Sequence, residues 1–281
     1  MVKVAAIQMS MSEDKTKNIA KAKNLVQQAA KNGANIILLP ELFEGLYFCK
    51  DMDKKYFTWA RERKNNPLLL EFQALAKELC VVLLVSYFEK DKNEYYNSLV
   101  VFDVDGKEMQ NYRKTHIPDG PGYEEKFYFK PGNTGFKVYD THYGKIGVGI
   151  CWDQWFCETA RSLTLQGAQI IFYPTAIGSE PEIGLDSKEH WQRVQMGHAS
   201  TNTVPVVAAN RIGVEEGQSC SLTFYGSSFI TDYTGKIVAE ASRDKEEIIY
   251  AEFDFQEDAK QREYWGLLRD RRPQMYGRIQ E

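Results

Sequence analysis

The sequence predicts an α/β domain made of two similar halves that pack face to face. Helical patterns alternate with short β-rich runs, as in α/β folds. Residues 33–40 read Gly-Ala-Asn-Ile-Ile-Leu-Leu-Pro and residues 167–174 read Gly-Ala-Gln-Ile-Ile-Phe-Tyr-Pro, each after a predicted helix. A common helix-to-strand junction would give the same pattern, so the repeat alone leaves two equivalent halves and a chance likeness both open. No linker or break in composition separates the halves, which predicts a single domain over residues 1–281.

The first half of the chain predicts three strands, two helices and a hairpin. Apolar residues at helical spacing precede Gly33, a common helix terminator, and Asn66-Pro67 has the cap and first-turn residues of a helix start. Asp105-Gly106 is a hairpin turn signal between two β-rich runs. The expected elements are strands at Val2–Met9, Ile36–Leu39 and Val81–Phe88, helices at Glu13–Lys31 and from Asn66, and a hairpin of Asn97–Asp103 with Lys107–Tyr112.

The second half begins with a stretch, residues 115–135, that has no period and several Pro-Gly or Gly-Pro breaks. We expect a long ordered loop there, and such loops are usually functional. The elements expected after it are a strand at Lys145–Ile150, a helix from Cys151 to Gln166, a strand at Gln169–Tyr173, a helix at Ser187–Thr201, a strand at Val204–Ala209, a hairpin of Phe229–Asp232 with Lys236–Ala239, and a strand at Ile248–Phe253. The polar tail, residues 264–281, is expected to pack on a neighbouring surface.

Composition limits the class of protein. The 281 residues are 43% hydrophobic and 26% charged, and 35 basic against 39 acidic residues give a net charge of −4. These values exclude a disordered or fibrous chain, and the slight acidity argues against a nucleic-acid partner. No apolar run approaches the roughly 18 residues of a membrane span, and the N-terminus lacks the apolar core of a signal peptide. We therefore expect no membrane partner and a cytoplasmic location.

Three chemically capable residues follow predicted strands. Glu41 follows the strand that ends at Leu39, Lys114 follows the one that ends at Tyr112, and Cys151 follows the one that ends at Ile150. Ligands bind at the carboxyl ends of strands in α/β sheets, so a carboxylate, an amine and a thiol are expected to converge.

Cys151 is the candidate nucleophile among five cysteines whose odd number and irregular spacing fit neither a disulfide framework nor a metal site. A helix N-terminus and the Lys114 ammonium would both favour its thiolate. Glu41 could then take the thiol proton and later activate water. The alternative is a buried cysteine that only fills space. None of the four histidines follows a strand in this way, so a Cys-His arrangement is not supported.

Three blocks of the sequence resemble the nitrilase, or carbon–nitrogen hydrolase, superfamily. Their order and context agree with the family, and the similarity runs from Val2 to about Tyr276. The resemblance implies a four-layer αββα sandwich, usually assembled as a homodimer or a larger homo-oligomer to which the tail contributes. The blocks are Pro40-Glu41-Leu42-Phe43, Tyr112-Arg113-Lys114-Thr115-His116 and Gly149-Ile150-Cys151-Trp152-Asp153.

The resemblance also implies the roles of the site residues. Glu41 would be the general base, Lys114 the stabiliser of the tetrahedral intermediate and Cys151 the nucleophile. A second glutamate is typical of the loop after the lysine. Glu125 is the best match and Glu124 stays open. Neither a metal nor a cofactor is implied.

Narrower segments resemble family members that cleave a small cationic carbamoyl amine, in which a carbamoyl group and an ammonium end a short aliphatic chain. Glu180, with Glu182 as the alternative, would bind the ammonium, while Tyr47 and Trp152 would flank the chain. The competing expectation is a sibling hydrolase for 3-ureidopropionate or an ω-amide, which would need a basic residue in place of Glu180. A solvated loop carboxylate and a non-catalytic scaffold are the alternatives without this chemistry. The segments are Pro40–Cys49, Asp119–Phe129 and Pro174–Pro181.

Overall fold

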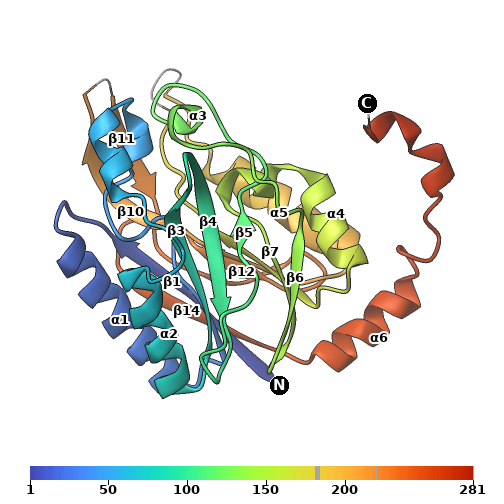
Figure 1. Cartoon of the computed structure of the whole chain (residues 1–281). Helices are drawn as coiled ribbons and strands as arrows, with labels where there is room; N and C mark the ends of the chain where they lie inside the picture. Colours follow the sequence, from blue (N-terminus) through green and yellow to red (C-terminus); the bar gives the residue numbers. More distant parts are fainter. Residues whose placement is uncertain (181–183, 219, 281) are drawn as a thin grey trace.

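The computed structural model describes residues 1–180, 184–218 and 220–280. This part of the chain forms two β-sheets that lie face to face, with helices on the outer face of each sheet (Figure 1). The predicted αββα sandwich is therefore confirmed.

The first sheet has eight strands and carries the N-terminus. In order, β11, β10, β1, β2, β3, β4 and β5 are neighbours, and β14 pairs antiparallel with β1. The parallel pairing of β1 with β2 and of β2 with β3 places their carboxyl ends at one edge. The strands are β1 (Val2–Ser10), β2 (Ile36–Leu38), β3 (Val82–Asp91), β4 (Glu94–Phe102), β5 (Tyr112–Arg113), β10 (Arg211–Glu216), β11 (Ser221–Tyr225) and β14 (Glu247–Phe253).

The second sheet has six strands in the order β13, β12, β9, β8, β7 and β6. The repeated Gly-Ala-x-Ile-Ile segments lead into β2 of the first sheet and β8 of the second, and both strands are fully buried. Each of these strands lies inside its sheet between two parallel neighbours, so their places are similar. The sheets are not two halves of the chain, because β10, β11 and β14 join the first sheet. The strands are β6 (Lys137–Thr141), β7 (Gly144–Val148), β8 (Ile170–Pro174), β9 (Val206–Ala209), β12 (Phe229–Thr231) and β13 (Ile237–Glu240).

Strand β1 shows how one strand contributes to two cores. Successive side chains of a strand point to opposite faces, so an apolar run can serve two cores. Val4 and Ala6 lie in the core between the two sheets, whereas Ala5 and Ile7 lie in the core under the helices of the first sheet. The inter-sheet core joins them to residues of the second sheet such as Phe172.

The helices form the outer layers. In the first of them, Ala22, Leu25, Val26 and Ala29 are buried at spacings of three and four, as the helical pattern requires. Two helices cover the first sheet and two cover the second (Figure 1). The α-helices are α1 (Lys15–Lys31), α2 (Pro67–Leu79), α3 (Glu125–Tyr128), α4 (Cys157–Leu165), α5 (Lys188–Asn202) and α6 (Phe255–Trp265). The 3-10 helices are η1 (Phe48–Lys50), η2 (Lys54–Trp59), η3 (Cys151–Trp155), η4 (Pro273–Met275) and η5 (Gly277–Gln280).

Two predicted elements are wrong in part. The segment from Lys107 to Asn111 joins its expected partner strand only through single contacts, because its side chains at 107, 108 and 110 are exposed and gain nothing by pairing. The sharper hairpin joins β3 and β4, whose pairing extends to Asp91 and Glu94. The helix expected from Cys151 to Gln166 is interrupted at Phe156, which is extended and stacks on the His116 ring. Strands β6, β10 and β11 and helix α6 were not predicted.

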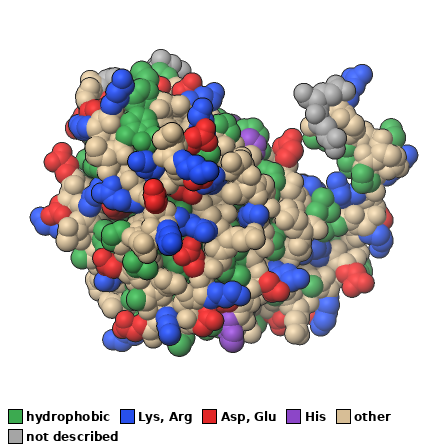
Figure 2. Space-filling view, viewed as in Figure 1, with side chains coloured by type: hydrophobic (Ala, Val, Ile, Leu, Met, Phe, Trp, Pro, Cys, Tyr) green, Lys and Arg blue, Asp and Glu red, His purple; other side chains and the backbone are tan. Residues whose placement is uncertain are grey.

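The chain leaves the sandwich after β14. Helix α6 and the tail run along one side, and the tail projects from the body (Figures 1 and 2). The described part of the chain contains no helix long and apolar enough to cross a membrane.

Candidate active site

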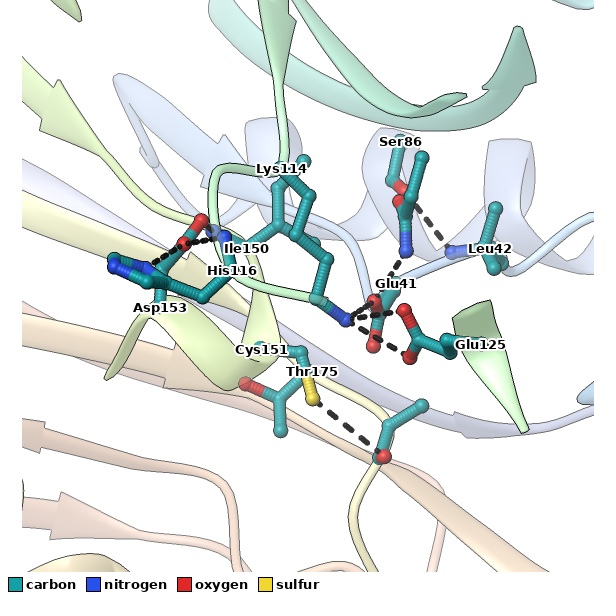
Figure 3. Close-up of polar contacts among 12 residues, drawn as sticks. Glu41, Leu42, Ser86, Lys114, His116, Glu125, Ile150, Cys151, Asp153 and Thr175 are labelled. Atoms are coloured by element: carbon teal, nitrogen blue, oxygen red, sulfur yellow. Dashed lines mark hydrogen bonds and ion pairs between the residues drawn. The ribbon is translucent and has the colours of Figure 1, made fainter. Parts of the chain in front are cut away.

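A buried lysine ammonium that contacts two carboxylates lies at the centre of the site. The Lys114 Nζ atom lies 2.9 Å from Glu41 Oε1 and 2.8 and 2.7 Å from the two carboxylate oxygens of Glu125. All three side chains are inaccessible to solvent. Figure 3 shows the ammonium between the two carboxylates, with Cys151 beside them. Burial lowers the pKa of Lys114, but Glu125 and Glu41 outweigh it and hold the pKa well above its usual value.

Glu41 is presented by the turn that follows β2. Asn97 of β4 donates from Nδ2 to Glu41 Oε1 at 2.6 Å, so this oxygen is shared by two donors. The other oxygen, Oε2, is buried and has no hydrogen-bond partner among the described residues. A buried carboxylate oxygen without a donor is costly unless a ligand or reacting group supplies one. Oε2 is therefore the Glu41 oxygen that remains to exchange a proton with a reacting group, although Glu41 is not among the described residues that line the cavity next to Cys151.

Glu125 begins the short helix α3, inside the long loop that the sequence predicted. The Tyr47 hydroxyl donates to Glu125 Oε1 at 2.7 Å. Burial raises the pKa of Glu125 to about 7, although Lys114 opposes the shift. Glu124 is partly exposed and makes no contact with Lys114 among the described contacts, so the structure selects Glu125 of the two.

Cys151 follows β7 and begins η3 in a left-handed conformation, with φ at 41°. Such a backbone is strained for a residue with a side chain, and strain of this kind is common at functional sites. The thiol contacts the Ala176 carbonyl at 3.7 Å.

The thiolate expected for Cys151 is corrected by the structure. Burial and the Glu41 carboxylate raise the pKa of the thiol well above its usual value, and Lys114 only partly offsets them. The physical reason is that the Lys114 charge is already neutralised by two carboxylates. The raised pKa favours the protonated thiol, so a nucleophilic role for Cys151 would need a base that removes this proton.

Asp153 fixes the position of Lys114 relative to Cys151, a role that the sequence analysis missed. One oxygen accepts from the backbone N–H of Ile150 and the hydroxyl of Tyr112; the other contacts the backbone N–H and the Nδ1 atom of His116. These partners flank Cys151 on one loop and Lys114 on the other. Asp153 belongs to the third family block of the sequence, which could have marked it as important. The block alone does not show which groups Asp153 binds.

The thiol opens into a cavity of about 410 Å³. Trp152, with 38% of its surface exposed, and half-buried Glu180 both line this cavity. The Ser187 hydroxyl donates to Glu180 at 3.3 Å, and burial raises the pKa of this carboxyl. The lining residues that sequence analysis did not identify include Tyr123, Trp155, Ser187 and His190.

Two predicted binding residues have different outcomes. Tyr47 is fully buried behind Glu125 and is absent from the described cavity lining, so it orients the carboxylate instead of flanking a substrate. Glu182, the alternative to Glu180, lies outside the described residues.

The raised pKa of Glu125 predicts a pH-dependent stability. Because the folded pKa of about 7 exceeds the ordinary value of 4.5, the folded state binds this proton more tightly. The contribution of Glu125 to the free energy of unfolding is complete below its pKa in the unfolded state. It is lost as the pH rises through its pKa in the folded state. We expect the free energy of unfolding of the wild type, relative to Glu125→Gln, to fall between those two pH values. Urea unfolding at stepped pH measures it, and parallel curves for the two proteins would contradict it.

The chain is similar over nearly its whole length to known proteins. Residues 3–262 match the family model described as carbon-nitrogen hydrolase. A citrullinase from Francisella tularensis is 54% identical over 279 residues, which are 99% of this chain and 98% of that protein. The N-carbamoylputrescine amidase of Arabidopsis thaliana is 54% identical over 280 residues, 98% of this chain and 94% of that enzyme. A carbon-nitrogen hydrolase from Helicobacter pylori superposes with a TM-score of 0.93 at 39% identity, over 100% of this chain and 98% of the other. The chain belongs to the carbon-nitrogen hydrolase family and is a hydrolase of carbon–nitrogen bonds.

Proposed function

We propose that the protein hydrolyses N-carbamoylputrescine to putrescine, carbon dioxide and ammonia. The observation that carries the proposal is one cavity that exposes both the Cys151 thiol and the Glu180 carboxylate. The thiol would attack a carbamoyl group at one end of the substrate, and the carboxylate would bind the ammonium at the other. The family and the plant relative support the same chemistry.

The first half of the reaction forms a covalent intermediate. Glu41 takes the proton of the Cys151 thiol as the sulfur attacks the carbamoyl carbon. The developing oxyanion is held by the Lys114 ammonium and by the backbone N–H of Trp152, which lies in the first turn of η3 and lacks an intrahelical acceptor. Glu41 then protonates the departing nitrogen, and ammonia leaves. The carbonyl carbon remains bonded to sulfur as a thiocarbamate.

Water completes the reaction. Glu41 takes a proton from a water molecule, whose oxygen attacks the same carbon, and the thiol of Cys151 leaves with that proton. The product is a carbamate of putrescine, which loses carbon dioxide. Throughout, Glu125 keeps Lys114 charged and oriented, because its two oxygens both accept from the ammonium.

The nucleophile is tested with two cysteine variants. Cys151→Ala should abolish ammonia release from N-carbamoylputrescine while the circular dichroism and unfolding transition stay close to those of the wild type. Cys157→Ala is the matched control, because Cys157 is exposed on α4 and outside this cavity. Ammonia release by Cys151→Ala at a rate near that of the control would refute the mechanism.

Citrulline is the second candidate substrate, because a citrullinase is as similar to this chain as the plant enzyme is. Citrulline carries the same ureido group and amine but adds a carboxylate. The described lining residues include the carboxylates of Asp119 and Glu180 and neither lysine nor arginine, although His190 is present. This set of charges favours an ammonium without a neighbouring carboxylate.

Glu180→Gln separates the candidates. Loss of the carboxylate should raise KM for N-carbamoylputrescine about tenfold, which corresponds to about 1.4 kcal/mol. The kcat/KM for N-butylurea, which has the same chain without the amine, should be unchanged. Steady-state assays with N-carbamoylputrescine, N-butylurea, citrulline and 3-ureidopropionate measure kcat and KM for each compound. Faster wild-type turnover of citrulline or 3-ureidopropionate than of N-carbamoylputrescine would overturn the substrate assignment.

We also propose that the enzyme forms a homodimer or larger homo-oligomer and works in the cytoplasm. Around the end of α6, Tyr264, Trp265 and Leu267 are 82%, 61% and 43% exposed, which is unusual for large apolar side chains close together. Burial against a second copy would remove this surface from water. Light scattering should give a mass at least twice the 32.3 kDa of one chain. Truncation before Tyr264 should lower that mass, and a monomer at assay concentration would contradict the proposal.

A further inference from the structure

A second buried ion pair lies behind the active site. Arg211 and Glu215 are four residues apart on β10, on one face of the strand, and their charged groups are 2.9 Å apart. Their side chains are 0% and 2% exposed, and neither is among the described lining of the catalytic cavity. Lys50, also buried, lies 4.0 Å from Glu215. The proposed mechanism does not use these charges.

Arg211 holds the backbone that presents Glu41. Its Nη2 atom donates to the Glu41 carbonyl at 2.7 Å and the Leu42 carbonyl at 3.2 Å, and Nη1 donates to the Gly45 carbonyl at 3.3 Å. Leu42 has φ at 48°, a left-handed conformation that is unfavourable for a residue with a side chain. The guanidinium is therefore placed to hold a strained turn in the one shape that directs Glu41 at Lys114.

Glu215 reaches the other carboxylate. Its Oε2 atom accepts from the backbone N–H of Tyr47 at 2.6 Å. The Tyr47 hydroxyl in turn donates to Glu125 at 2.7 Å. The Tyr47 ring is fully buried, and its centroid lies 5.7 Å from that of the Phe224 ring. Because the packed ring cannot move freely, the position of the Tyr47 backbone sets the position of its hydroxyl.

We infer that the Arg211–Glu215 ion pair is the common support that positions both carboxylates flanking Lys114. Arg211 acts through the Glu41 turn, and Glu215 acts through Tyr47. A buried ion pair contributes little to stability when compared with apolar residues of similar volume, so stability alone does not account for charges in this place. Both are positioning residues, since neither touches the reacting atoms, and the inference rests on the proposed function.

The role predicts a particular kinetic effect. Displacement of Glu41 relative to Cys151 weakens proton transfer from the thiol but leaves the cavity wall that contains Glu180 unchanged. In Arg211→Lys and Glu215→Gln, kcat for N-carbamoylputrescine should fall about 10- to 100-fold, the cost of misplacement by about 1 Å. KM should stay within about twofold of the wild-type value. Because the Glu41 carboxylate raises the pKa of the Cys151 thiol, its displacement should shift the pH profile of Cys151 alkylation by iodoacetamide to lower pH than in the wild type.

A double variant separates positioning from stability. Arg211→Met leaves Glu215 buried without its ion-pair partner and should unfold at a lower temperature than the wild type. Combining Arg211→Met with Glu215→Leu removes both charges, so thermal stability should recover relative to the single variant while kcat stays low. Val26→Ala, in the core under α1, is the control that loses stability without losing kcat.

The outcomes distinguish this inference from the proposed function. Recovery of kcat together with stability in the double variant, or an unchanged pH profile of alkylation in every Arg211 and Glu215 variant, would overturn the positioning role. A wild-type protein that alkylates at Cys151 but does not hydrolyse N-carbamoylputrescine would overturn the substrate instead, and the alkylation profiles of the variants would still test the support.

Discussion

One ammonium group buried between two carboxylates sets the conditions for the rest of the site. Lys114 needs at least one counter-charge to remain protonated without water, and Glu41 and Glu125 provide two. The excess negative charge then acts on the neighbours: together with burial it raises the pKa of the Cys151 thiol. The cluster thus favours the protonated form of the thiol next to it, and it contains Glu41, the carboxylate that we propose removes the thiol proton.

Cys151 lies next to this cluster only because the two sheets face each other. Glu41 and Lys114 follow strands β2 and β5 of the first sheet, whereas Cys151 follows β7 of the second. Packing between the sheets therefore sets the distance of Cys151 from Glu41 and Lys114. Asp153 adds a local connection, since its carboxylate bonds to both the Lys114 loop and the Cys151 turn.

In the proposed function, substrate choice depends on groups outside this cluster. Half-buried Glu180 and Trp152 both line a cavity large enough for a short aliphatic chain. Two relatives of equal identity differ in the substrate that their names give. The proposal of an amine substrate for this chain therefore rests on the acidic residues that line its cavity.

Apolar periodicity and strand-end position are local properties of the chain, so the sequence by itself predicted most of the strands and that Glu41, Lys114 and Cys151 converge, while the four layers followed from the resemblance to a family. It failed where partners are distant in sequence. The choice of Glu125 over Glu124 depends on which carboxylate reaches Lys114, and the displacement of Tyr47 from the cavity depends on its bond to Glu125. The raised pKa of Cys151 was also decided by tertiary structure, because burial and the sum of neighbouring charges exist only once both sheets have packed.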